Sequence, residues 1–431
     1  MSDVNLGLAA TGRAARVQRP ATGLATSDGR PLRVALASAQ ARAKRRAFLL
    51  VLPLLLFILL TFLVPIGQML QRSVYHDGFS KAAPSLTGWF AANPAGSAPD
   101  EAAFAALAAD LLLMKERRLT GEAGTRINYS VPGTRSLFTS SARGADGLAP
   151  PYREALIAED GKWGDPLVWV AMREAASPWT SDFYLTGIDM QRSPDGGIER
   201  VAGTNRVYLW LYARTFLLSG LITGICLLLA FPVAHLLATL PMAKANLLMI
   251  LVLLPFWTSL LVRTSSWIVL LQGQGVINSL LVAAGIIDDS GRLAMIYNQT
   301  GTIIVMVHIL LPFMVLPLYS VMRVIPPGYA RAARSLGATS WTTFRRIYLP
   351  QTLPGIGAGV LLVFILAVGY YITPALVGGA EGQLYSNQIQ FHMSKSNWSQ
   401  AAALAAMLLA GILLLYWLYD RLIGIDKLKL G

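Results

Sequence analysis

Between two apolar segments of this chain lies a stretch of small and basic residues whose spacing suits a contact with another protein. Its key positions are Arg331, Ala332, Ala333, Leu336, Gly337, Ile347, Leu349 and Pro350. The alanines are small, strong helix formers, and Pro327 suits a first helical turn, so a smooth-faced helix is expected. Gly337 then permits a backbone conformation, or a close approach, that a side chain would block.

A second short helix is expected after this glycine. Thr339 or Ser340 can cap its first turn. Its aromatic face, at helical spacing, comprises Trp341, Phe344 and Tyr348. Pro350 and Pro354 should end the helix before the next apolar segment. Two such helices can lie along a membrane surface while a partner holds the other side. An ordinary amphipathic interfacial segment is the alternative.

This pattern resembles the EAA loop of ABC-importer permeases. In that family Glu-Ala-Ala is followed by three residues, a glycine, nine residues and Ile-x-Leu-Pro, and every fixed position matches here except the first, where Arg331 replaces glutamate. The resemblance implies that residues 323–353, the EAA-type loop, dock onto a separate ATPase. Because the charge at residue 331 is reversed, we expect an acidic residue on that ATPase to face Arg331.

The chain offers little chemistry of its own. The phosphate-binding pattern Gly-x-x-x-x-Gly-Lys-Ser/Thr does not occur, so ATP is expected to be bound by the partner, and no cofactor, metal or enzymatic activity is expected here. The four histidines are scattered over different segments: His76, His235, His308 and His392. Cys226, the single cysteine, excludes an intramolecular disulfide and is expected to be a buried apolar residue.

Composition identifies a polytopic membrane protein. The 431 residues are 54% apolar and only 14% charged, and a bilayer span needs about 20 mainly apolar residues. We expect an all-α protein with six transmembrane helices. The candidate spans are roughly 47–70, 208–239, 247–267, 301–322, 355–373 and 400–419.

The basic residues, which give a net charge of +13, cluster by loop rather than on one nucleic-acid-binding face. They concentrate in residues 1–46, the turn after the second span, the EAA-type loop and the C-terminal tail. With six spans all four lie on one side, which the positive-inside rule makes the cytoplasm, with both termini there. Residues 1–46 are expected to be a disordered basic cytoplasmic arm, and residues 47–70 an uncleaved anchor.

Residues 71–206 hold most of the acidic residues, interleaved with arginines and turn formers, and are expected to form a folded periplasmic insertion. Residues 102–114 should be helical, whereas residues 167–172 could form a helix or a strand. The insertion could help to hold a solute-binding protein, or it could have no specific function.

From residue 207 to residue 431 the chain resembles one subgroup, the spermidine/putrescine-type ABC permeases. The matching residues are Phe231 to Ala234, Leu254 to Ser259, Leu261 to Thr264, Gly275 to Asn278, Leu311 to Tyr319 and Thr373 to Gly379. The resemblance implies half of an importer in the bacterial inner membrane, paired with a second permease subunit. Two cytoplasmic ATPases and a periplasmic solute-binding protein are the other implied partners.

The spans say less about the solute. They contain no Asp or Glu, so a polyamine would have to pass over aromatic faces, for which Trp257, Tyr370 and Tyr371 are candidates. Arg263 or Arg214 could instead meet an anion, although each could also snorkel to the interface. The resemblance to spermidine/putrescine permeases therefore implies a polyamine as the solute, with another organic cation, an amino-acid derivative or an anion as the alternatives.

Two other classes of protein remain as alternatives. A stand-alone secondary carrier or channel predicts ionisable relays or internal repeats within the spans, and neither is evident. A membrane-embedded enzyme predicts catalytic groups clustered at one membrane face, which the scattered histidines do not provide.

Overall fold

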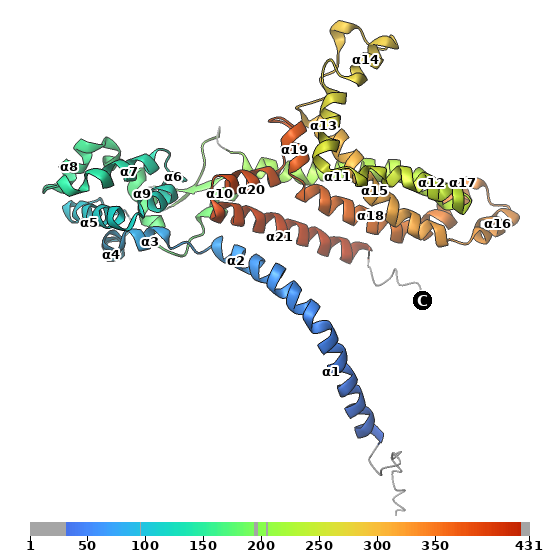
Figure 1. The fold of residues 1–431 in the computed structure, drawn as a ribbon, viewed down its shortest axis with the longest axis horizontal. Helices are drawn as coiled ribbons and strands as arrows, with labels where there is room; N and C mark the ends of the chain where they lie inside the picture. Colours follow the sequence, from blue (N-terminus) through green and yellow to red (C-terminus); the bar gives the residue numbers. More distant parts are fainter. Residues whose placement is uncertain (1–31, 95, 194–196, 204–205, 424–431) are drawn as a thin grey trace, which may run out of the picture. The chain divides into compact units, whose positions relative to one another are not determined.

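Helices make up almost all of the described chain. The computed structural model describes residues 32–94, 96–193, 197–203 and 206–423. Within these ranges the only strands are β1 (Met190–Arg192) and β2 (Ile198–Arg200), an antiparallel pair in which Met190 lies opposite Arg200 (Figure 1). The predicted all-α class is confirmed, and the chain divides into two units after Gly67.

The first unit contains a long apolar helix. Its parts are α1 (Leu32–Ile58), a π turn (Leu59–Leu63) and the start of α2 (Val64–Arg72). Pro65 lacks the N–H that would bond the carbonyl of Thr61, and the helix widens into the π turn just before it. The predicted disorder of residues 1–46 is wrong for residues 32–46, where alanine, arginine and lysine favour helix. Residues 1–31 lie outside the described ranges.

Six helical segments of the described chain are long and apolar enough to cross a membrane, as predicted. They are Ala39–Arg72, Tyr208–Thr239, Leu260–Ala283, Gln299–Val324, Ser340–Gly369 and Trp398–Arg421. The labelled helices within the last five are α11 (Tyr208–Thr239), α13 (Leu260–Leu271), α14 (Val276–Ala283), α15 (Gln299–Val324), α17 (Ser340–Thr343), α18 (Leu349–Gly369) and α21 (Trp398–Ile423).

The prediction of a single helix over residues 247–267 is wrong. The chain instead forms α12 (Met242–Leu253), a 3₁₀ turn (Leu254–Trp257) and α13. Pro255 has no N–H to continue α12, and the Ser259 hydroxyl accepts the N–H of Val262 at 3.2 Å, which starts the new helix. Apolar residues continue on both sides of this break, from Leu253 and Leu254 to Leu260 and Leu261, so the apolar run alone does not reveal it.

The prediction that Pro350 and Pro354 end the second helix of the EAA-type loop is also wrong. The helix starts at α17, widens into a π turn (Phe344–Tyr348) and continues as α18. Pro350 lies in the first turn of α18, directly after the π turn, where a missing N–H is tolerated. The EAA-type loop is therefore continuous with the fifth span.

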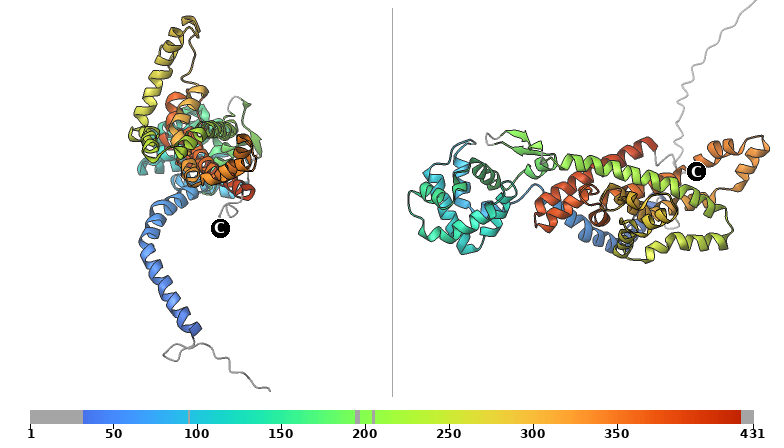
Figure 2. Two further views of the ribbon diagram at one scale, coloured as in Figure 1. Left: turned by 90° about the vertical axis from the view of Figure 1, so that its right-hand side faces the viewer. Right: turned by 90° about the horizontal axis from the view of Figure 1, so that it is seen from above.

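Three spans, α11, α15 and α18, run side by side around the main core of the second unit (Figures 1 and 2). Fully buried residues such as Ile222, Met314 and Val363 fill it. Gly359 lets α18 approach α15, because a Cβ there would lie 2.7 Å from Met314 Sδ. Cys226 is buried as predicted, with its thiol 3.6 Å from the carbonyl of Val307.

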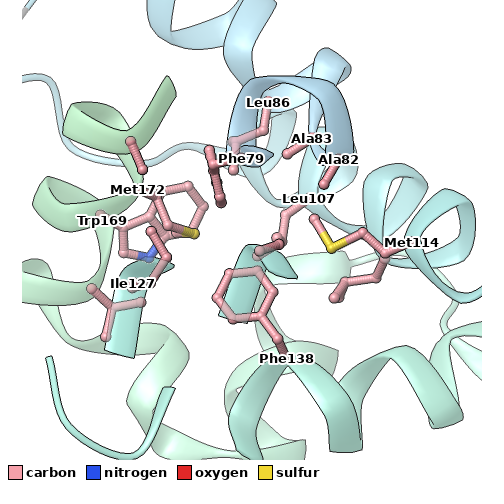
Figure 3. Packing of buried hydrophobic residues seen from close by; sticks show 14 of the residues in the cluster. Phe79, Ala82, Ala83, Leu86, Leu107, Met114, Ile127, Phe138, Trp169 and Met172 are labelled. Atoms are coloured by element: carbon pink, nitrogen blue, oxygen red, sulfur yellow. The ribbon is translucent and has the colours of Figure 1, made fainter. Parts of the chain in front are cut away.

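The segment between the first two spans is a cluster of short helices. They are α3 (Gly78–Ala82), α4 (Pro84–Ala92), α5 (Glu101–Arg117), α6 (Thr120–Asn128), α7 (Thr134–Gly144), α8 (Tyr152–Glu159), α9 (Pro166–Ala176) and α10 (Asp182–Gly187). The predicted helix over residues 102–114 lies in α5, and residues 167–172 are helical rather than a strand. The cluster has its own core, in which Phe79, Phe138 and Trp169 are buried (Figure 3).

Polar contacts join the end of this helical cluster to two spans, α11 and α21. Asp189 is buried, and its carboxylate accepts three N–H groups at the start of α11: those of Val207 and Tyr208 at 3.0 Å and of Leu209 at 2.9 Å. Nearby, the Gln400 amide of α21 donates to the carbonyl of Phe183 in α10 at 3.0 Å.

Candidate functional site

The EAA-type loop begins with α16 (Pro327–Ser335), and Gly337 ends this helix in a left-handed conformation with φ of +88°. The N–H of Gly337 donates to the carbonyl of Arg334, and that of Ala338 to the carbonyl of Ala333, each at 3.0 Å. These two bonds form a Schellman motif, which needs positive φ at the residue after the cap. A Cβ on Gly337 would meet nothing within 4 Å, so its conformation, rather than close packing within this chain, explains the glycine.

The residues predicted to dock lie on an open surface. No residue of α16 is buried, and Leu336 is 89% exposed despite being apolar. Arg331, Ala332 and Pro350 are exposed as well, whereas Ala333, Ile347 and Leu349 are partly buried. Among the described residues the Arg331 guanidinium has neither a hydrogen bond nor an ion pair. The loop thus offers an apolar tip and an unpaired cation, while its role in docking stays a prediction.

The charge of this surface has one sign. No Asp or Glu occurs in residues 323–353, whereas five arginines do: Arg323, Arg331, Arg334, Arg345 and Arg346. Arg323 has a structural role, because its Nη1 donates to the carbonyls of Ala238 at 2.8 Å and Leu240 at 3.1 Å, at the end of α11. The remaining arginines leave a basic face suited to an acidic partner surface.

Two pairs of ring side chains join the EAA-type loop to α11. Phe344 lies edge-on to Phe231 of α11 with ring centroids 6.0 Å apart. One helical turn further along both segments, the Tyr348 hydroxyl is 2.8 Å from Nδ1 of His235, whose ring is edge-on to the tyrosine. We call these four residues the aromatic clasp. On the loop side, Trp341 stacks on Phe344 with centroids 5.7 Å apart.

Sequence reasoning missed the α11 half of the clasp. The spacing of Phe344 and Tyr348 predicted an aromatic face but did not identify what it covers. Phe231 and His235 have the same spacing at the inner end of the second span. Two aromatic pairs with the same spacing, both expected at the same membrane face, could have indicated that they pack against each other.

The residues predicted to line a translocation pathway are only partly brought together. Arg263 Nη2 donates to the carbonyls of Pro255 and of Thr258, the latter at 3.1 Å. Its guanidinium therefore stabilises the broken third span, which competes with a role in binding an anion.

Two of the other candidates have different surroundings. Trp257, in the 3₁₀ turn, is 86% exposed. Tyr371 is partly exposed, and its carbonyl accepts the amide of Asn387 at 2.8 Å. His308 accepts the indole N–H of Trp267 at 3.0 Å. Pathway roles for Trp257, Arg263, Tyr370 and Tyr371 stay predictions.

Comparison with known proteins identifies the family of this core. The sequence profile of the family described as "Binding-protein-dependent transport system inner membrane component" matches residues 217–423. The spermidine/putrescine transport system permease protein PotB of Haemophilus influenzae is 37% identical over 219 residues, which are 50% of this chain and 76% of PotB. PotB of Escherichia coli is 39% identical over 204 residues, 46% of this chain and 73% of that protein.

A solved structure of a bacterial alginate ABC transporter, in complex with an alginate pentasaccharide-bound periplasmic protein, is also similar to this chain. Its TM-score is 0.43 with 17% identity, covering 52% of this chain and 81% of that one. The sequence relatives identify the family without it: this chain belongs to the inner-membrane permeases of binding-protein-dependent ABC importers, and is a multi-pass inner-membrane protein.

Proposed function

We propose that this permease forms half of the translocation pathway for a polyamine such as spermidine or putrescine. The observation that carries this proposal is the 37–39% identity to spermidine/putrescine permeases over 204–219 residues, about half of this chain. A second permease subunit completes the pathway, two cytoplasmic ATPases supply energy, and a periplasmic solute-binding protein delivers the solute. The clustering of basic residues by loop supports a topology with both termini and the EAA-type loop in the cytoplasm and the helical insertion outside.

The EAA-type loop is the proposed ATPase-docking element. In this mechanism ATP binding closes the two ATPases and brings the docked loops together. The continuous helix from α17 to α18 and the aromatic clasp then move the fifth and second spans, which turns the pathway from one side of the membrane to the other. Such a rigid-body switch needs stiff connections, and paired aromatic rings between packed helices provide one.

The solute can be tested directly. In liposomes that contain the permease together with the second permease subunit, the ATPase and the solute-binding protein encoded beside it, we expect ATP-dependent uptake of labelled spermidine or putrescine. This uptake should be saturable and should depend on the solute-binding protein. Uptake of a different organic cation, an amino-acid derivative or an anion under the same conditions would replace the polyamine proposal. Uptake without any ATPase would instead support the stand-alone carrier.

Docking can be tested through the backbone of Gly337. Gly337→Val should abolish co-purification of the ATPase in mild detergent, because a β-branched residue is strongly disfavoured at φ of +88°. Gly337→Asn should retain it, because asparagine tolerates the left-handed region. Loss with both variants would show instead that the partner approaches a bare backbone. If the ATPase co-purified with both variants, the proposed docking role of the turn at Gly337 would be contradicted.

Arg331 tests the expected charge match. We expect Arg331→Glu to weaken capture of the native ATPase about tenfold, because an acidic partner residue would then face a like charge. Arg334→Glu makes the same change of charge on the same short helix, so it measures the general electrostatic part of the effect and should weaken capture less. Equal weakening by both would indicate a diffuse electrostatic effect, and tighter binding of Arg331→Glu would disprove an acidic partner residue.

A further inference from the structure

The helical insertion contains a large cavity of about 960 Å³ between α4, α9 and the segment leading into α10. This volume lies within the range of small-molecule sites, roughly 300–1,000 Å³. Much of the wall is aromatic: Trp89, Phe90, Phe104, Trp163, Trp169 and Trp179. Trp169 is buried in the wall, whereas Trp179 is 66% exposed at the rim. The cavity is thus a pocket with an apolar lining and an open mouth.

Carboxylates occupy one part of this lining. Glu174 of α9 and Asp182 of α10 both line the cavity, together with Arg192 of β1. Arg192 Nε is 2.9 Å from Asp182 Oδ1 but 3.6 Å from Glu174 Oε1, which is too long for a hydrogen bond. Glu174 Oε1 is buried and has no hydrogen-bond partner among the described residues. A buried carboxylate oxygen without a donor is costly, and a ligand N–H group would relieve that cost.

The arginines of the cavity do not form an anion site. Arg173 is held in the wall, where its Nη1 donates to the carbonyls of Phe90 at 3.2 Å and Asn93 at 2.7 Å, with its guanidinium 4.8 Å over the Phe90 ring. Arg192 is shared by two carboxylates, and Arg153 is exposed. An anion near Arg192 would therefore meet Glu174 and Asp182, which repel it.

We propose that this cavity binds an organic amine, whose ammonium group donates to Glu174 Oε1 while its alkyl chain lies against the indole rings of Trp169 and Trp179. Ammonium groups are attracted both by carboxylates and by aromatic faces, and this cavity combines the two. The site lies in the insertion, away from the spans. The inference therefore stands whether or not the transported solute is a polyamine.

Amine binding should depend on pH through Glu174. Burial, reinforced by the nearby Asp182 carboxylate, raises the pKa of Glu174 to about 7, against the opposing effect of Arg192 and Arg126. The ammonium group needs the ionised carboxylate. Affinity should therefore fall as the pH decreases below 7 and reach a plateau above pH 8.

The test uses the full chain in detergent, with tryptophan fluorescence and calorimetry as readouts. The probes are putrescine, its uncharged analogue 1,4-butanediol and the dianion succinate. We expect saturable binding of putrescine alone, weakened about tenfold or more by Glu174→Gln, with loss of the pH dependence. The exposed carboxylate variant Glu116→Gln is the matched control and should bind like the wild type.

Three results would overturn the proposal: equal binding of 1,4-butanediol, preferential binding of succinate, or putrescine binding that Glu174→Gln leaves unchanged. The last would place the amine elsewhere, for example in the spans. The thermal midpoint of Glu174→Gln checks its folding, and the rim variant Trp179→Ala gives a second test at an exposed residue. It should weaken putrescine binding severalfold, whereas unchanged affinity would argue against the aromatic contact.

Discussion

Replacing Phe344 with alanine is expected to leave ATPase docking intact and to reduce solute uptake per ATP hydrolysed by about tenfold. Phe344 lies behind the proposed docking surface, and its ring is paired with the rings of Phe231 of α11, Trp341 and Tyr348. Its removal opens a gap between the loop and α11, so motion of the loop is absorbed locally instead of moving the span. Uptake and ATP hydrolysis measured together in liposomes would show this.

Trp341→Ala is the control for the aromatic clasp. Trp341 stacks on Phe344 but is 68% exposed and makes no described ring contact with α11. Its removal should therefore change the coupling ratio little. Tyr348→Phe keeps the ring and removes only the hydrogen bond to His235, so it should have a small effect.

A double substitution decides whether the clasp acts as a pair. Phe231→Ala and Phe344→Ala should each lower coupling, and together they should lower it little further, because each alone already breaks the contact. Strict additivity, or an unchanged coupling ratio in Phe344→Ala, would mean that α18 alone transmits the motion. Failure of ATPase capture in Phe344→Ala would mean instead that the residue belongs to the docking surface.

Local chemistry made the EAA-type loop predictable. The position of Gly337, the cap at Thr339 and the aromatic spacing each depend on a few adjacent residues, and each is found in the structure. The number of spans, six, could also be predicted, because hydropathy depends on the composition of about 20 consecutive residues.

The errors occurred where one residue acts against its surroundings. Pro255 ends a helix within an apolar segment that was predicted to form one span. Pro350, by contrast, was predicted to end a helix, but the helix forms a π turn just before it and continues. The helix over residues 32–46 is built from good helix formers, in a stretch whose lack of an apolar run suggested disorder.

The contacts made by tertiary packing could not be predicted from patterns in the sequence. Nothing near Glu174 in the sequence indicates that Asp182 and Arg192 lie beside it in the lining of one cavity. The partners of the aromatic clasp are much farther apart in the sequence, as the 113-residue separation of His235 and Tyr348 shows. Tertiary packing creates both features, and a single sequence without aligned relatives carries little trace of them.

Asp189 is the second position where a large effect is expected, in stability rather than coupling. Its carboxylate is the cap of α11, yet it comes from a residue well before the helix begins, held at φ of +56°. Asp189→Ala would leave three N–H groups unpaired at the outer end of the span and place alanine in the left-handed region. We expect a loss of about 3 kcal/mol or more, because hydrogen bonds to a charged group are the strong ones.

Two further variants separate the cap from the backbone strain. Asp189→Asn keeps one acceptor oxygen and tolerates positive φ, so it should lose about half as much stability. Asp189→Gly removes the cap but suits the backbone, so it should fall between asparagine and alanine. Thermal melting in detergent gives the order, and hydrogen exchange at Val207, Tyr208 and Leu209 locates the effect. If exchange at these amides stayed as slow in Asp189→Gly as in the wild type, another group would cap α11, and Asp189 would matter only for the turn that contains it.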